Sequence, residues 1–151
     1  MDHQDAAILR ALQSDSRRPV AELAELLGLS ASACHRRIKT LEATGVIKGY
    51  AARIDRKKLG LTLHVFVDIT LNSQGREVLE QFEKAVAGAP DILECHLTSG
   101  SADYMLRVVA RDMADYDRIH RECLSGLPFV SIMHTTFVLR PVKPWQGYPV
   151  K

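Results

Sequence analysis

Apolar positions recur every three or four residues through the first 45 residues of the chain. This spacing is typical of amphipathic helices. Two apolar stripes precede residue 28, made by Ile8, Leu9 and Leu12, and by Val20, Leu23, Leu26 and Leu27. Pro19 suits the first turn of the second helix, Ser30 is a good N-cap for a third, and Gly28 and Gly45 are natural helix ends. The pattern predicts three short helices joined by tight turns, which is the layout of a helix-turn-helix.

From residue 61 the period changes to two, the period of a half-buried strand. Alternating apolar positions predict a first strand over 61–71, and helical spacing predicts a helix over about 75–88. Strand-like segments follow at 92–98 and 104–110, then a helix at about 113–127 and a strand at 130–139. The order β-α-β-β-α-β is that of the ferredoxin-like fold, an antiparallel sheet with both helices on one face. The uncovered face predicts pairing with another copy of the chain.

We therefore expect an α+β protein with two domains. Residues 1–60 would form a helix-turn-helix domain with its linker, and residues 61–151 a ferredoxin-like domain that oligomerises. The stretch VIKGYAARID at 46–55 reads as one or two small strands or a wing. The proline-rich end of the chain, PVKPWQGYPVK, reads as an extended segment in which Trp145 packs against a neighbour.

The net charge of +2 conceals a difference between the two halves. Residues 1–60 carry 11 Lys and Arg against 7 Asp and Glu, whereas residues 61–151 carry 9 against 11. A basic first domain suggests a polyanionic partner for that domain alone, although a solvated basic surface is the plainer alternative. We find no leader-like N-terminus and no apolar run of the ~18 residues that a membrane span needs. The composition predicts a soluble, cytoplasmic protein.

The third helix, at about 30–44, separates its side chains by kind. With about 100° between successive residues, Cys34, Ile38 and Leu41 share one apolar stripe. Ser32, Arg36 and Lys39 lie on the opposite side, while His35 and Arg37 flank the stripe. Small polar and long basic side chains suit the major groove of DNA, where arginine can bind guanine with two hydrogen bonds and lysine neutralises phosphate.

Cysteines and histidines occur close together at three places, which raises the alternative of a metal or redox site. Cys34 and His35 are adjacent, so their side chains diverge on a helix, and no C-x-x-C or H-x-x-x-H pattern accompanies them. Cys95 and His96 would point to opposite faces of a strand, and Cys123 lies on the apolar stripe of its helix. Core packing is favoured for the cysteines, and we expect no metal and no cofactor.

At these residues the chain resembles the Lrp/AsnC, or feast/famine, family of transcriptional regulators. The first half matches the family pattern at Gly28-Leu29-Ser30, Cys34, Arg36-Arg37, Leu41-Glu42 and the run Gly45-Val46-Ile47-Lys48-Gly49-Tyr50. The second half contains the Gly-x-x-Asp-Tyr loop of the family's ferredoxin-like effector domain at residues 100–104. The resemblance extends from about residue 2 to residue 143.

The resemblance implies a regulator that binds double-stranded DNA, senses an amino acid or similar metabolite, and forms homodimers that often assemble into octamers. The residues that it implies for DNA binding are Ser30, Ser32, His35, Arg36, Arg37 and Lys39. Those that it implies for the effector are Thr98, Gly100, Ala102, Asp103 and Tyr104 in the loop 98–104 and, more loosely, Thr135 and Thr136 of the last strand. The resemblance also implies that residues 1–60 are a winged helix-turn-helix DNA-binding domain with its linker and that residues 61–151 are a ferredoxin-like domain for effector binding and oligomerisation. The effector site would lie in the interface between copies.

The loop at 98–104 also admits a chemical interpretation independent of the family. Glycine permits a turn with free N–H groups that can hold a carboxylate, and Asp103 could accept hydrogen bonds from an ammonium group. The plainer alternative is a hairpin connection in which Gly100 serves the turn and Asp103 caps it.

Two rival functions stay open at the level of the sequence. One is an enzyme with a ferredoxin-like catalytic domain, although no obvious nucleophile–base pair is present, so we expect a protein that is not an enzyme. The other is a structural module that forms oligomers, which would have no need of a basic helix.

Overall fold

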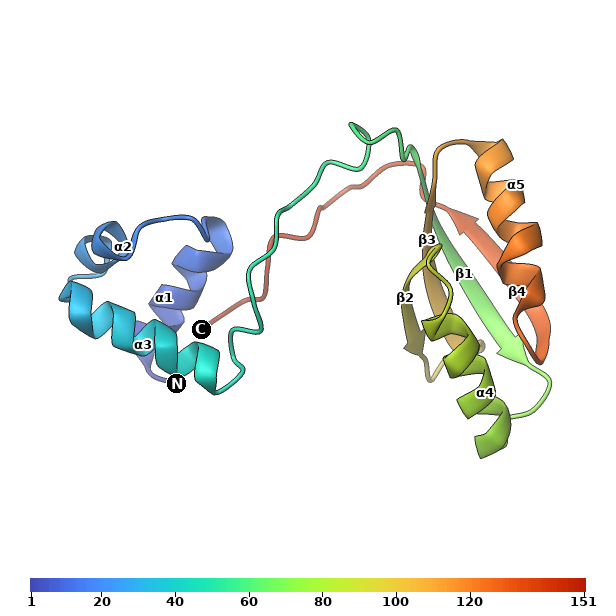
Figure 1. The fold of residues 1–151 in the computed structure, drawn as a ribbon, viewed down its shortest axis with the longest axis horizontal. Helices are drawn as coiled ribbons and strands as arrows, with labels where there is room; N and C mark the ends of the chain where they lie inside the picture. Colours follow the sequence, from blue (N-terminus) through green and yellow to red (C-terminus); the bar gives the residue numbers. More distant parts are fainter. The chain divides into compact units, whose positions relative to one another are not determined.

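The structure, a computed structural model, describes all residues from Met1 to Lys151, and the chain forms two compact units (Figure 1). Unit 1 comprises Met1–Arg53 together with Val142–Lys151, and unit 2 comprises Ile54–Pro141. The chain therefore passes from one unit to the other twice. The domain boundary that the sequence suggested near Gly60 remains a prediction.

Unit 1 contains three helices, α1 (His3–Ser14), α2 (Val20–Leu26) and α3 (Ala31–Ala43). Asp2 caps α1 and exchanges hydrogen bonds with Asp5 in a capping box. The Ser30 hydroxyl caps α3 by accepting the N–H of Ala33. Between α2 and α3, Gly28 has a φ of +66°, a conformation that glycine adopts without steric cost. The predicted three-helix arrangement is confirmed.

The small core of unit 1 lies where the three helices meet. Ile8 of α1, Leu23 of α2 and Cys34 of α3 are fully buried in one cluster. Ile38 and Leu41 complete the apolar stripe of α3, as the helical spacing predicted. The burial confirms Cys34 as a core residue.

Residues 46–53, which follow α3, form neither helix nor strand. The small strands expected from the apolar and β-branched residues of this stretch therefore do not form. A strand requires a ladder of backbone hydrogen bonds to a neighbour, and this segment has none. It is held instead by Ile47, whose side chain packs on the helical core and whose N–H donates to the carbonyl of Leu41 at 3.0 Å.

Unit 2 contains a four-stranded antiparallel sheet with the strand order β2-β3-β1-β4. Its elements follow the chain as β1 (Leu63–Leu71), α4 (Arg76–Ala87), β2 (Ile92–Leu97), β3 (Tyr104–Ala110), α5 (Met113–Glu122), a short 3₁₀ turn η1 (Leu124–Gly126) and β4 (Val130–Phe137). The predicted β-α-β-β-α-β order is confirmed. The second helix is shorter than the range 113–127 because its last turn tightens into η1.

Both helices of unit 2 cover the same face of the sheet (Figure 1). Alternate residues of β1 and β3, such as Val65, Val67 and Leu106, are fully buried there with Phe82 of α4 and Ile119 of α5. The other residues of these strands face away from the helices and are only partly buried. The sheet therefore has one covered face and one open face, as the period of two predicted.

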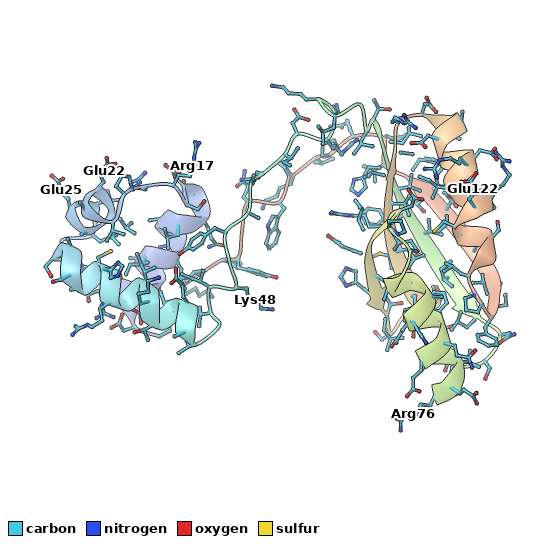
Figure 2. All side chains as sticks on the ribbon, in the orientation of Figure 1. Arg17, Glu22, Glu25, Lys48, Arg76 and Glu122 are labelled. Carbon is cyan, nitrogen blue, oxygen red and sulfur yellow. The ribbon has the colours of Figure 1, made fainter.

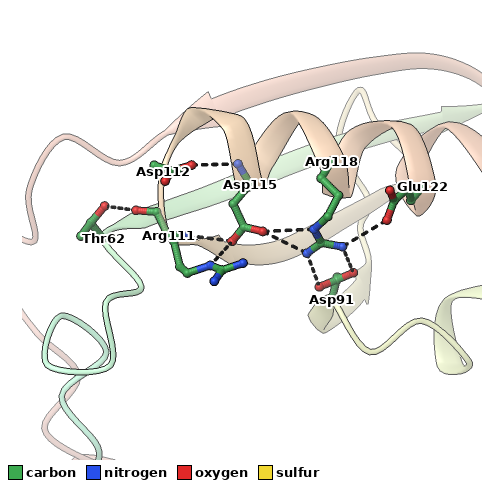
Figure 3. Close-up of polar contacts among 7 residues, drawn as sticks. All are labelled: Thr62, Asp91, Arg111, Asp112, Asp115, Arg118 and Glu122. Atoms are coloured by element: carbon green, nitrogen blue, oxygen red, sulfur yellow. Dashed lines mark hydrogen bonds and ion pairs between the residues drawn. The ribbon is translucent and has the colours of Figure 1, made fainter.

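A network of charges fixes the start of α5 (Figure 3). The Asp115 carboxylate accepts hydrogen bonds from the backbone N–H of Arg111 at 2.9 Å and from the Arg118 guanidinium at 3.1 Å. Arg118 also pairs with Asp91, which precedes β2, at 3.4 Å. The hydrogen bond from the Arg111 N–H, with those from the Arg111 and Arg118 side chains, lowers the pKa of Asp115 to about 2.

This network predicts an acid-sensitive contribution to the stability of unit 2. Because the folded pKa of Asp115 lies below its ordinary value of 3.8, its stabilisation is complete above that value and disappears as pH falls toward 2. Asp115→Asn should lower the melting temperature at pH 7 and bring the variant closer to the wild type at pH 3. Thermal unfolding followed by circular dichroism over this range measures the difference. Asp117→Asn, on the exposed side of α5, is the control, and an equal deficit of Asp115→Asn at both pH values would contradict the assignment.

Candidate DNA-binding surface and effector loop

The outward face of α3 presents a polar and basic surface. Ser32, His35, Arg36 and Lys39 are all exposed. The guanidinium of Arg36 forms no ion pair within the chain, whereas Lys39 pairs with Glu42 at 2.8 Å. An exposed pair of this kind contributes little to stability, so Lys39 can exchange Glu42 for a phosphate at small cost. We call Ser32, His35, Arg36 and Lys39 the basic face of α3.

Arg37 lies outside this face because α1 engages its guanidinium. Its Nη1 donates to Asp2 at 2.8 Å and to Asp5 at 2.7 Å. The hydrogen bonds to Asp5 and Asp2 raise the pKa of Arg37, and the pKa of Asp2 is lowered, first by the N–H of Asp5 and also by Arg37. These ion pairs connect α3 to the start of α1. The contact of Arg37 with DNA stays a prediction.

The end of α3 is fastened to the segment that follows. The Tyr50 hydroxyl donates to Glu42 at 3.0 Å, and Gly45, with a φ of +72°, lets the backbone turn out of the helix. The hydrogen bonds from Lys39 and Tyr50 lower the pKa of Glu42. Sequence spacing gave no sign of the bond between Tyr50 and Glu42, because it depends on the path of the chain after Gly45.

The surface of α2 differs in charge from that of α3. Glu22 and Glu25 project from α2 into solvent (Figure 2). A polyanion approaching unit 1 is therefore repelled at α2 and attracted at the basic face of α3.

The loop between β2 and β3 is closed by hydrogen bonds of its own. The N–H of Thr98 donates to the carbonyl of Asp103 at 2.8 Å, and the hydroxyl of Thr98 donates to the carbonyl of Ala102 at 2.7 Å. Tyr104 is buried at the start of β3, where its hydroxyl donates to Glu83 at 2.8 Å. Burial is the main cause that raises the pKa of Tyr104 well above its ordinary range, and the hydrogen bond to Glu83 raises it further.

Asp103 anchors this loop to the neighbouring strand. Its side chain is buried, accepting the N–H of Leu71 at 2.8 Å and the amide of Gln74 at 2.7 Å, while its own N–H donates to the carbonyl of Ile69. The interpretation of Asp103 as a cap within the loop connection thus gains a structural basis. Its role in binding an ammonium group stays a prediction.

The tip of the loop has unused hydrogen-bonding capacity. The backbone N–H groups of residues 99–102 donate no hydrogen bond within the chain. Gly100 has an ordinary backbone conformation, and a Cβ added there would meet no atom within 4 Å. Nothing in the single chain therefore requires glycine at this position. The tip is instead an accessible group of N–H donors that a close-approaching anion could use.

Thr135 and Thr136 lie apart from this loop. In the sheet Tyr104 is opposite Ile69, whereas Thr136 is opposite Phe66 on the other side of β1. Thr135 points toward the helices, where its hydroxyl and that of Tyr116 are 2.8 Å apart. The fold of one chain does not bring these two threonines together with the loop 98–104.

Comparison with known proteins follows the same division of the chain. Residues 1–42 match the AsnC-type helix-turn-helix domain and residues 64–147 match the Lrp/AsnC ligand-binding domain. The leucine-responsive regulatory protein of Escherichia coli is 41% identical over 143 residues, which cover 95% of this chain and 87% of that protein. The chain belongs to the Lrp/AsnC family.

Solved structures of Lrp/AsnC-type regulators also share its fold. An AsnC family transcriptional regulator from Agrobacterium tumefaciens superposes with a TM-score of 0.93 at 36% identity, covering 99% of this chain and 97% of that one. A transcriptional regulator from Neisseria meningitidis, solved as a complex with L-Met, gives 0.92 at 30% identity, covering 99% and 96%. The protein is thus a helix-turn-helix transcriptional regulator of the Lrp/AsnC type with a ligand-binding domain.

Within this Lrp/AsnC chain, the cysteines do not gather with other potential ligands. Cys95 packs against the core of unit 2 and Cys123 borders it. No cluster of three or more His, Cys, Asp or Glu side chains is arranged to hold a metal ion. None of its helices combines the length and apolar character required to cross a membrane.

The anchoring of Asp103 predicts a structural effect of its replacement. Asp103→Asn replaces one carboxylate oxygen with an NH₂ group, which cannot accept the hydrogen bond that this oxygen received. We expect a loss of about 1–3 kcal/mol in the free energy of unfolding of unit 2, measured by urea titration. The side chain of Asp91 is less buried than that of Asp103, so Asp91→Asn serves as the comparison variant. An unfolding free energy of Asp103→Asn equal to that of the wild type would show that the anchor has no energetic importance.

Proposed function

We propose that this regulator inserts α3 into the major groove of its operator DNA and responds to an amino acid bound at the tip of the loop 98–104. The loop site would be completed in the interface between copies of the chain. The observation that carries the DNA part is the basic face of α3, on which Arg36 is exposed and has no ionic partner in the chain.

The composition of this face supports direct contact with DNA. Arg36 can donate two parallel hydrogen bonds to guanine, Lys39 can neutralise a phosphate, and Ser32 and His35 can reach a phosphate or a base edge. Ser30 contributes through its cap, which orders the first turn of α3. We keep Arg37 in the proposal as a contact to phosphate rather than to a base, because its guanidinium also forms ion pairs with Asp2 and Asp5 of α1.

The free N–H groups of residues 99–102 support the effector part. Consecutive N–H donors suit a carboxylate, the group that every amino acid carries. That the related regulator from Neisseria meningitidis was solved with L-Met favours an amino acid as the ligand. Within one chain, neither the backbone conformation nor the space at residue 100 requires glycine. This favours a close approach by a ligand or by a second copy at the loop.

The open face of the sheet supports a homodimer, and we propose that dimers assemble further into octamers. This face carries Phe66, and on it the Nε2 of His64 and the Nε of Arg107 are buried without a hydrogen-bond partner. Burial is the main cause that lowers the pKa of His64, and the positive charges of Arg107 and Arg56 lower it further. A buried polar atom without a partner is costly, so a second chain that supplies hydrogen-bond partners would relieve this cost.

We further propose that the protein acts by binding rather than by catalysis, in the cytoplasm. Its relatives are transcriptional regulators, which act on DNA, and in bacteria DNA is in the cytoplasm.

Replacement of Arg36 tests the DNA part. If Arg36 contacts a base, Arg36→Ala should weaken binding to operator DNA by about 1–3 kcal/mol and relax sequence preference. Fluorescence anisotropy titrations with duplexes from the protein's own promoter region at fixed salt give the affinity. Arg76→Ala, on the exposed surface of α4, removes the same charge from unit 2 and should leave the affinity nearly unchanged. Equal affinities of both variants and wild type, at unchanged assembly mass by light scattering, would exclude Arg36 from the interface.

Replacement of Ala102 tests the effector part. Ala102→Asp places a negative charge beside the free N–H groups and should abolish the rise in melting temperature that a responding amino acid causes. Thermal-shift measurements with the twenty amino acids, starting from L-Met, identify the responding compound in the wild type. Ala114→Asp, at the exposed start of α5, introduces the same charge elsewhere. A full response by Ala102→Asp, or no response of the wild type to any of the twenty, would contradict the proposed site.

A further inference from the structure

The end of the chain returns from unit 2 to unit 1. Residues 142–151 form one compact unit with residues 1–53, although 88 residues, 54–141, separate the two stretches in the sequence. This C-terminal segment contains neither helix nor strand. We call residues 145–150 the strap.

The side-chain amide of Gln13, in the last turn of α1, binds the backbone of the strap with both of its polar atoms. Its Oε1 accepts the N–H of Tyr148 at 2.6 Å, and its Nε2 donates to the carbonyl of the same residue at 3.1 Å. A neighbouring strand would offer the backbone the same pair of hydrogen bonds. The amide of Gln13 thus takes the place of a strand partner at one residue of the strap.

Two arginines bind the backbone on either side of this pair. Arg10 of α1 donates to the carbonyl of Val150 at 3.1 Å, and Arg53 donates to the carbonyl of Trp145 at 2.9 Å. All four hydrogen bonds go to the main chain of the strap, so they depend on its path rather than on its side chains. Trp145 and Tyr148 pack edge to face, with ring centroids 4.8 Å apart.

Gly147 is the residue that this path requires. Its φ of +108° is a conformation that residues with a side chain rarely adopt. A Cβ at this position would also lie 2.8 Å from Cδ of Gln13, too close for any real contact, and would displace the amide that holds Tyr148. The glycine and the glutamine therefore fit each other, and two independent features of the chain point to one binding surface.

We propose that the surface formed by Arg10, Gln13 and Arg53 is a specific binding site for the chain's own C-terminal strap. The strap then gives unit 1 a second attachment to unit 2, through residues 138–144 after β4, in addition to the segment that follows Arg53. The C-terminal segment thus contributes to the structure of the helix-turn-helix unit.

The only tryptophan of the protein, Trp145, lies in the strap and reports its state. In time-resolved fluorescence anisotropy of the full chain, Trp145 of the wild type should rotate with the folded protein. Gln13→Ala and Gly147→Ala should each add a large decay component that is faster than the rotation of the folded protein, because exposed side chains reorient within picoseconds to nanoseconds. Gln4→Ala, on the same helix and away from the strap, should leave the decay unchanged.

Gly147→Ala keeps this test independent of helix stability, since it changes the strap and not α1. Circular dichroism checks that each variant keeps its helix content. Slow rotation of Trp145 retained in both Gln13→Ala and Gly147→Ala would overturn the proposed binding site. This measurement needs no DNA, so its outcome is separate from that of the proposed function.

A second readout rests on the proposed function. A unit held by two attachments loses less conformational entropy when it binds DNA. Undocking the strap should therefore weaken operator binding several-fold. Gln13→Ala and Gly147→Ala should show the same loss, although one change is in α1 and the other in the strap. Operator affinity equal to wild type in variants whose Trp145 has become mobile would overturn the role of the strap as an attachment that matters for DNA binding.

Discussion

The position of β1 at the centre of the sheet constrains the rest of unit 2. This strand pairs with β3 on one side and with β4 on the other, and its alternate residues Val65, Val67 and Ile69 are fully buried beneath both helices. A slip of one residue would move these side chains to the open face and expose them. Because the register is fixed in this way, the carbonyl of Ile69 accepts the N–H of Asp103, and the N–H of Leu71 donates to the Asp103 carboxylate. The loop 98–104 is therefore held at one end of β1, through Asp103, by the same alternation that builds the core.

The same register determines what the open face presents. Phe66 and Arg107 face each other across β1 and β3, and the polar atoms of His64 and Arg107 that lack partners lie on this side. A face that combines an aromatic ring with buried polar atoms that lack partners is suited to another protein surface rather than to water. The packing of the core and the proposed pairing of chains thus rest on the same period of two in the sequence.

The sequence was most informative where local periodicity and burial agree. The alternation of YMLRVVA predicted β3 at the bounds that the structure has, and the helical spacing of Cys34, Ile38 and Leu41 predicted the buried stripe of α3. It failed where the outcome depends on a distant partner. The residues at 46–55 have strand-forming character, but no neighbouring backbone completes a ladder. The ion pairs of Arg37 with Asp2 and Asp5 of α1 were likewise not visible in the sequence pattern, and its contact with DNA stays a prediction.

Glycines illustrate the same limit, because one residue type serves different purposes at different positions. Gly28 and Gly45 end helices, and their positive φ values could be anticipated from the apolar pattern around them. Gly147 has a positive φ for another reason, the close approach of Gln13, which only the folded chain reveals. Gly100 has neither an unusual φ nor a crowded Cβ. The single chain leaves this glycine unexplained, and the free N–H groups beside it are in keeping with the proposed approach of an anionic ligand.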